Sequence, residues 1–270
     1  AAPTHPRPRS ASEERDLRAA LDHAGGPLLL TGAAGSGRTT ALAERFRALA
    51  DAGLAPSNVL AIAPGPVSAA TLRGAVASAF DGFSGDEPTV TTITAAAAKL
   101  LRDEPAAGGG DALTQTATRT DRLALLLDRL DELPLRHHDL GGRPAATLAG
   151  ILTRIDEIKA AGASSADVAS WAAGLPDDRR GAAREREFAA IMQAHDRMLE
   201  AQGLLDHGEV VLRASRLLER REDVAERAAA RARALLVDRL EDASPAELRL
   251  VELLCSRHGQ LVALGGEALE

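Results

Sequence analysis

Tyrosine is absent from this sequence of 270 residues, and cysteine and lysine are nearly so. The single cysteine, Cys255, cannot form an internal disulfide, and no cysteine–histidine spacing predicts a zinc site. Apolar runs all stop well short of the roughly 18 residues that a membrane span needs, and no signal peptide opens the sequence. These absences exclude a disulfide scaffold, and we expect a reduced, cytoplasmic protein without a membrane partner.

Lysine supplies only Lys99 and Lys159 among 32 basic residues, and the formal net charge is −7. We attribute the wealth of alanine and arginine to a GC-rich genome, and the net charge argues against a generally basic nucleic-acid binder. Binding of single strands generally needs aromatic platforms beside a basic groove. The five aromatic residues are instead expected to pack in the core: Trp171, Phe46, Phe80, Phe83 and Phe188.

Hydrophobic residues nevertheless make up 45% of the chain, and their pattern changes along it. Short apolar runs predict strands at 28–31, 58–63, 89–93, 234–237 and 260–264. Helical periodicity is found at 12–21, 38–52, 72–80, 119–133, 145–161, 184–200, 209–233 and 245–255. A further helix is predicted through Lys99 and ends near Asp103.

This order divides the chain. Residues 1–11 are expected to form a disordered tail, and 104–111 (EPAAGGGD) a flexible linker. Two stretches with strands, 12–103 and 204–270, enclose a block, 112–203, that shows only helical periodicity. We therefore predict an α/β domain that carries an inserted, all-helical subdomain.

A glycine-rich segment, GAAGSGRTT, follows the first strand and precedes a helix. It matches the phosphate-binding pattern G-x-x-x-x-G-K-[ST], except that arginine replaces the lysine. Glycines leave the backbone N–H groups free to surround phosphate oxygens, and the helix adds its positive end. The alternative is a glycine-rich turn that binds no ligand. The predicted phosphate-binding residues are Gly32, Gly35, Ser36, Gly37, Arg38, Thr39 and Thr40.

Arg38 weakens the prediction of catalysis. A planar guanidinium is bulkier than an ammonium and cannot act as the same point charge between the β- and γ-phosphates. Weakened or lost hydrolysis follows from this residue alone.

Several motifs in order resemble the UvrD/Rep/PcrA type of superfamily 1 DNA helicase. The glycine loop and the strand NVLAIA resemble the family's G-x-G-K-T loop and I-L-A-I-T-F-T-N strand. VTTITAAAAKLL resembles its T-F-H-S segment, and LLDHGEVVLRASRLL its D-F-D-D-L region. LLVDRLEDASPAELRLVELL and LVALGGEALE resemble the D-E-x-Q-D-T and V-G-D-x-x-Q strands. The resemblance implies a RecA-like P-loop NTPase sheet, with the helical block as the inserted 1B subdomain.

In the acidic strand the resemblance assigns the Mg²⁺-side aspartate to Asp238 and the water-activating glutamate to Arg239. Arginine cannot accept a proton from water. No catalytic residue is therefore predicted, while Thr39 and Asp238 are the predicted magnesium ligands for bound ATP. Glu241 and Asp242 are the only nearby acids that could substitute, and we favour solvated loop acids that cap the next helix.

Other positions of this sequence also differ from the family motifs. The residues that replace family side chains are Leu17 for the adenine-reading glutamine, Pro64, Gly65 and Pro66 for F-T-N, Thr94 for the histidine, Gly266 for the aspartate and Leu269 for the phosphate-sensing glutamine. The pair His137–His138 is expected to lie in a polar loop, and the arginine-rich helix 213–233 to present a solvated face.

The resemblance implies the first part of a helicase motor whose ATP site is impaired, within a longer protein. Such motors occur in two-motor helicase–nuclease assemblies, where a catalytically active partner subunit hydrolyses ATP and DNA contacts the larger assembly. The composition is consistent with the AdnA type of subunit from a high-GC organism. Two alternatives remain open: an active helicase that tolerates both arginines, and an unrelated P-loop kinase or GTPase.

Overall fold

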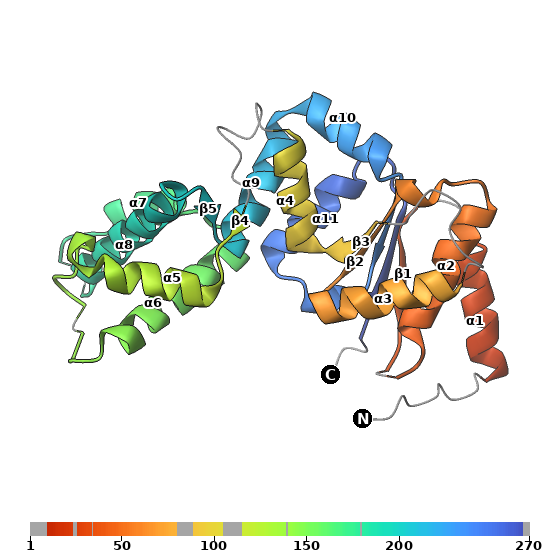
Figure 1. The fold of residues 1–270 in the computed structure, drawn as a ribbon, viewed down its shortest axis with the longest axis horizontal. Helices are drawn as coiled ribbons and strands as arrows, with labels where there is room; N and C mark the ends of the chain where they lie inside the picture. The colour runs from red at the N-terminus through yellow and green to blue at the C-terminus, as the bar shows by residue number, and fades with distance from the viewer. Residues whose placement is uncertain are drawn as a thin grey trace. The chain divides into compact units, whose positions relative to one another are not determined.

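A computed structural model describes residues 10–23, 26–33, 35–79, 89–104, 115–138, 140–178 and 180–266. Most of the predicted tail and of the predicted linker lies outside these ranges. The described residues form two compact units, each with its own hydrophobic core (Figure 1). Unit 1 takes its residues from 1–96, 218–243 and 248–270, and unit 2 from 97–217 and 244–247.

Unit 1 contains a parallel sheet with the strand order β1–β7–β6–β2–β3. Its strands are β1 (Leu28–Thr31), β2 (Val59–Ala63), β3 (Thr89–Thr92), β6 (Ala234–Val237) and β7 (Leu261–Gly265). In the register, Thr31 is opposite Gly265 and Val237 is opposite Ala263. Because the strands are parallel, their carboxyl ends share one edge, where ligands of open α/β sheets bind. The predicted strands and the RecA-like α/β fold are confirmed.

Helices cover both faces of this sheet. On one face, α2 and α3 pack Phe46 and Leu72 against Val59, Leu236 and Leu264 in a single core. The connection from β6 to β7 runs back across the strand order, so its helix α11 lies on the other face (Figure 1). The helices are α1 (Ala11–Leu21), α2 (Arg38–Asp51), α3 (Pro66–Ser78), α10 (Glu222–Arg231) and α11 (Pro245–Cys255), with short 3₁₀ turns η1 (Pro56–Asn58) and η3 (Leu240–Asp242).

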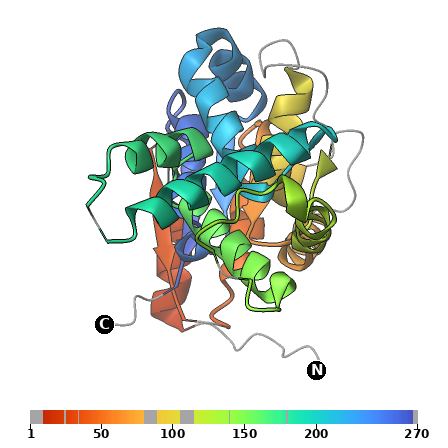
Figure 2. The same cartoon turned by 90° about the vertical axis from the view of Figure 1, so that its left-hand side faces the viewer.

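Unit 2 is mainly helical. Its longest helix, α8, packs with α5, α6 and α7 around buried side chains such as Leu126, Ile155 and Phe188 (Figure 2). Two helices start with capping boxes, in which Thr118 and Ser164 exchange hydrogen bonds with an aspartate three residues later. The helices are α5 (Arg119–Asp128), α6 (Pro144–Ala160), α7 (Ser165–Ala173), α8 (Ala182–Glu200) and most of α9 (His207–Arg220), with η2 (Leu130–Glu132). Helices α4 (Ile93–Asp103), α9 and α11 each have residues in both units.

The inserted block is helical, as predicted, except for one two-residue strand near its start. Strand β4 (Gln115–Thr116) pairs in parallel with β5 (Leu204–Leu205), and the N–H of Ala117 donates to the carbonyl of Leu205 at 2.8 Å. Strands of two residues are too short to show an alternating pattern, so the sequence carries no signal for them.

The predicted helix 209–233 is also wrong in its extent, because it is two helices. Arg221 between them has extended backbone angles, with φ −122° and ψ 94°. Neither glycine nor proline marks this break, so helical periodicity continues across it in the sequence. None of the helices that the structure describes is long and apolar enough to cross a membrane.

Candidate functional site

The glycine-rich loop joins β1 to α2 at the carboxyl edge of the sheet, and all of it except Ala34 is described. Gly35 and Gly37 have φ values of 81° and 83°, in the left-handed region that favours glycine. A Cβ on Gly32 would lie 2.7 Å from the hydroxyl of Ser36. The backbone therefore favours glycine at two positions of the predicted motif, and at the third a larger residue would have to displace the Ser36 hydroxyl.

The loop ends at the amino terminus of α2, which begins at Arg38. Its N-cap, Gly37, has no side chain to accept a hydrogen bond, and the first turn carries no acid. Backbone N–H groups at such a helix start attract anions, because they combine unsatisfied donors with the positive end of the helix dipole. Chemically, this end of α2 is suited to a phosphate group.

Thr39 and Asp238 are brought together at this edge. Asp238 follows β6, is buried, and donates its N–H to the carbonyl of Ile62 at 2.8 Å, while its carboxylate forms a side-chain hydrogen bond with Thr39. Burial raises the pKa of Asp238, and the guanidiniums of Arg38 and Arg239 only partly offset this effect. Mg²⁺ usually takes one or two protein oxygens beside substrate phosphates, so these two oxygens fit that ion.

Arg38 points its guanidinium at an acid. Its Nη1 lies 3.2 Å from Oε1 of Glu241, and the two side chains are 18% and 35% exposed. The expectation that Glu241 and Asp242 cap the next helix is wrong, because Ser244 and Glu247 form that cap: Ser244 N–H donates to the Glu247 carboxylate at 2.8 Å. Sequence reasoning therefore missed the contact of Glu241 with the loop.

Arg239 stands where the resemblance places the water-activating glutamate. Among the described residues, it is the one non-glycine residue with a positive φ, 57°. Its side chain is half exposed and pairs with the carboxylate of Asp242 at 2.5 Å. The position next to Asp238 thus presents a cation that is bound to its own acid.

The other replaced positions have structural roles. Leu17 is buried on α1, which packs on α2, and Gly65 and Pro66 form the cap and first residue of α3. Thr94 is the second residue of α4, and Gly266 directly follows β7. Leu269 lies outside the described residues.

The aromatic residues only partly follow the prediction. Phe46 and Phe188 are buried, as expected, whereas Phe80 and Phe83 fall outside the described ranges. The prediction for Trp171 is wrong, since it is 50% exposed on α7. An alanine-rich helix gives little periodicity from which its outer face could be identified.

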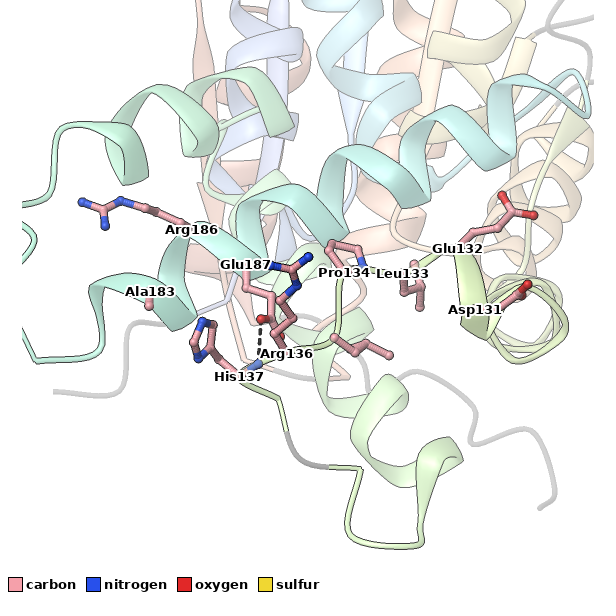
Figure 3. Close-up of a pocket in the computed structure, with 10 residues that line it drawn as sticks. Asp131, Glu132, Leu133, Pro134, Arg136, His137, Ala183, Arg186 and Glu187 are labelled. Carbon is pink, nitrogen blue, oxygen red and sulfur yellow. Dashed lines mark hydrogen bonds between the residues drawn. The ribbon is translucent and has the colours of Figure 1, made fainter.

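A cavity of about 750 Å³ in unit 2 offers a second candidate site (Figure 3). It lies between residues 131–137 and α8, from which Glu187 points toward the loop. The buried Glu187 carboxylate accepts the N–H groups of His137 at 2.6 Å and His138 at 2.9 Å, and it contacts the ring of His138. Burial raises the pKa of Glu187, but these hydrogen bonds prevail and leave that pKa lowered.

These contacts indicate that Glu187 anchors the segment that contains His137 and His138. Arg186 in the same wall is likewise engaged, by the carbonyl of Leu175 and the carboxylate of Asp177. The histidine pair does lie in a loop, but His138 is buried, and its ring contacts Glu187.

Three potential metal ligands, His195, Asp196 and Asp206, also gather in unit 2, with ligand atoms within 4.8 Å of one another. The ammonium of Lys159, however, donates to both aspartates at 2.7 Å. A cation of the chain itself therefore holds these carboxylates, which gives the cluster a structural role.

The UvrD/REP helicase N-terminal domain matches residues 14–267 of the chain. The chain belongs to the UvrD/REP helicase family. The resemblance inferred from the ordered motifs is thereby confirmed.

Individual members of the UvrD/REP family show the same similarity. The chain is 28% identical over 246 residues to the ATP-dependent DNA helicase UvrD1 of Mycobacterium leprae, covering 90% of this chain and 30% of that protein. It is 24% identical over 249 residues to the ATP-dependent DNA helicase Rep of Escherichia coli, covering 92% and 35%. The chain thus spans about a third of the length of these relatives.

Proposed function

We propose that this chain is the first part of the motor of an ATP-dependent DNA helicase in which ATP hydrolysis is lost or strongly impaired. The observation that carries the proposal is Arg239. Beside Asp238, where an attacking water would need a proton acceptor, a guanidinium is bound to Asp242. Arginine remains protonated at any pH at which a protein is folded, so it cannot serve as a general base.

Phosphate binding is the part of the activity that the residues support. The loop glycines and the start of α2 would hold the phosphates of ATP, with Arg38, Thr39 and Thr40 at the first turn. Thr39 and Asp238 would hold Mg²⁺, which neutralises charge on the phosphates when it is bound. Two arginines near Asp238 reduce its attraction for a divalent cation, and Leu17 cannot hydrogen-bond a base edge. We therefore expect weak binding of ATP.

The relatives are named as DNA helicases, and from this we propose that DNA reaches the chain through a larger assembly. A motor without hydrolysis would act there as a scaffold beside a catalytically active helicase–nuclease partner. This is the role that the resemblance to an AdnA-type subunit implies. Membership in the UvrD/REP family removes the alternative of an unrelated P-loop kinase or GTPase.

The proposal is tested by measuring single-turnover hydrolysis of radiolabelled ATP by the full-length protein, with Mg²⁺ and single-stranded DNA present. We expect no turnover above background, whereas a rate of about 1 s⁻¹ lies in the ordinary range of enzymes and would contradict it. That result would favour the second candidate, an active helicase that tolerates Arg38 and Arg239.

Two variants locate the defect. Arg239→Glu supplies the missing carboxylate, and Arg38→Lys combined with it supplies the usual loop cation. We expect neither to reach 1 s⁻¹, because Leu17 and Leu269 still lack the polar groups of the motifs. Full hydrolysis by the double variant would show that only two positions separate this chain from an active site.

A further inference from the structure

The Arg38–Glu241 ion pair joins the phosphate-binding loop to the segment after β6. We propose that Glu241 is an internal anion of this site: its carboxylate takes the place of a nucleotide phosphate on Arg38, and it must leave before ATP or pyrophosphate binds. The inference rests on the phosphate-binding role proposed above. It adds a residue that sets the affinity, at the position that aligns with the glutamine of the D-E-x-Q-D-T motif.

Position supports this role. Arg38 stands at the loop position whose side chain contacts the β- and γ-phosphates in P-loop proteins. Its guanidinium is largely buried, at 18% exposed, and lies 3.2 Å from the Glu241 carboxylate. Glu241 accepts from Nη1 of Arg38, and a phosphate that binds through Nη1 must displace this carboxylate, because both are anionic acceptors for the same donor group.

The end of β7 leaves room for the pair. A Cβ on Gly266 would lie 3.0 Å from Oε1 of Glu241 and 3.7 Å from Nη1 of Arg38. Both ends of the ion pair thus lie against this glycine. A larger residue there, such as the aspartate of the family motif, would crowd the Glu241 carboxylate, so Gly266 and Glu241 form a matched set.

The backbone after β6 aims Glu241 at the loop. Arg239 adopts the left-handed conformation and starts the 3₁₀ turn Leu240–Asp242, which contacts β7. Asp242 in the same turn bonds Arg239 instead of Arg38. The two acids of one turn therefore have separate partners, and this provides a matched control.

The effect of competition between the Glu241 carboxylate and a phosphate can be estimated. A phosphate must break an ion pair that is worth up to about fivefold in an equilibrium constant, as measured for partly exposed pairs. It must also approach a negative carboxylate, because like charges repel. Removal of the Glu241 charge should therefore tighten phosphate binding by about fivefold to tenfold.

Two separate titrations of residues 1–270 test the proposal, one with a fluorescent ATP analogue and Mg²⁺ and one with inorganic pyrophosphate in the absence of Mg²⁺. Glu241→Gln keeps the shape of the side chain and removes its charge, while Asp242→Asn makes the same change on the acid that bonds Arg239. We expect Glu241→Gln to bind both probes at least about fivefold tighter than the unsubstituted chain, and Asp242→Asn to stay within about twofold.

The possible results separate this inference from the proposed function. Equal, measurable affinity in the unsubstituted chain and Glu241→Gln overturns the internal anion and leaves the nucleotide site standing. If no variant binds either probe, the phosphate-binding role and the internal anion both fail, while the loss of hydrolysis stands. Loss of residual hydrolysis at unchanged affinity in Glu241→Gln also overturns it, because Glu241 would then act as the replacement base.

Gly266→Ala provides a second test that does not remove a charge. Gly266 does not require a left-handed backbone, so alanine mainly adds the crowding methyl group. We expect Gly266→Ala to tighten pyrophosphate binding about twofold to threefold in the unsubstituted chain and to have no effect in Glu241→Gln, as for residues that share one contact. An equal effect in both backgrounds contradicts the contact, and far-UV circular dichroism checks folding.

Discussion

Arg239 combines an unfavourable backbone with a partly exposed ion pair. A left-handed conformation costs a non-glycine residue roughly 1–2 kcal/mol, because its Cβ crowds the following carbonyl. Its ion pair with Asp242 is about half exposed on both sides and cannot return that much. The local chain therefore tolerates strain where the strand passes into the 3₁₀ turn.

Glycine at this position should relieve the strain. We predict that Arg239→Gly is more stable than Arg239→Ala by about 1 kcal/mol, since both variants lose the ion pair and only alanine keeps the crowded Cβ. Urea unfolding followed by far-UV circular dichroism measures the difference. Equal stabilities of the two variants would contradict the left-handed backbone at residue 239.

Sequence reasoning succeeded here for residues adjacent to a recognised element and failed for those beyond it. Thr39 was singled out by the glycine loop that precedes it, and Asp238 by the family resemblance of the strand that precedes it. Glu241 lies two residues past the left-handed Arg239, and no glycine or asparagine marks that turn in the sequence. Its contact with Arg38, 203 residues away, depends on a backbone reversal that periodicity cannot reveal.

Helices α6, α8 and α9 meet at a buried charged cluster in unit 2. The ammonium of Lys159 is fully buried and donates to Asp196 and Asp206, with Glu209 at 3.3 Å. Asp206 also caps α9, where its carboxylate accepts the N–H of Glu209 at 2.8 Å. One side chain from α6 therefore connects α8 with the start of α9.

The close approach of α6 to α9 also depends on glycine. A Cβ on Gly208 would lie 2.5 Å from the Cβ of Lys159, a distance that real structures do not show. The charged cluster and the small residue fix the same contact. Of the two lysines in the chain, one thus serves as a buried connector, while Lys99 forms an exposed pair with Asp103.

Removal of the buried ammonium should be costly. We predict that Lys159→Met lowers the free energy of unfolding of unit 2 by about 3–5 kcal/mol, because buried carboxylates lose their cation. The matched control, Lys99→Met, breaks the exposed pair and should cost at most about 1 kcal/mol. Trp171, the only tryptophan, lies in unit 2, so its fluorescence during urea unfolding reports this unit. Equal losses of unfolding free energy in the two variants would contradict a stabilising role of the buried cluster.

The same cluster predicts a dependence on pH. Burial raises the pKa of Asp206, but Lys159 and Arg122 prevail and leave it lowered, and the pKa of Asp196 is lowered as well. Carboxyl groups with lowered folded-state pKa values contribute stability above their unfolded pKa of about 4 and lose it below. Burial lowers the pKa of Lys159, but the carboxylates raise it overall, so its contribution is lost only above about pH 10.5.

We therefore predict that the two aspartates affect the stability of the native chain and of Lys159→Met differently between pH 7 and 5. Without the ammonium, burial dominates and raises the pKa values of both aspartates, so the folded variant takes up protons and gains stability as the pH falls. The native chain gains nothing from these two groups in that range. The difference in unfolding free energy, measured by Trp171 fluorescence, should narrow toward pH 5, and a constant difference would contradict this prediction.

At the scale of elements, periodicity identified the long helices because their apolar faces pack on one core. It could not find the strand pair β4–β5 or the break at Arg221, which leave no apolar signature. Nor could it find the Lys159 cluster. The buried polar residues of α6 and α8 interrupt an apolar face, and only the folded chain shows that they neutralise one another.

At the scale of the whole molecule, the described residues form two units with separate cores, and the glycine-rich loop belongs to unit 1. Unit 1 is assembled from segments on both sides of unit 2 in the sequence, which is why the prediction of an inserted block could be made from the chain order alone. The cores share no residue: that of unit 1 lies between the sheet and α2 and α3, and that of unit 2 between helices.

A ligand at the loop should therefore stabilise one unit and not the other. Ligand present at 100 times its dissociation constant stabilises the folded state by about 2.7 kcal/mol. We predict that pyrophosphate at that excess over the Glu241→Gln variant shifts the part of the far-UV circular dichroism transition that belongs to unit 1. Trp171 fluorescence, which follows unit 2, should keep its urea midpoint. Equal shifts of both signals would mean that the two units unfold as one, and a shift of fluorescence alone would place the anion in unit 2 rather than at the loop.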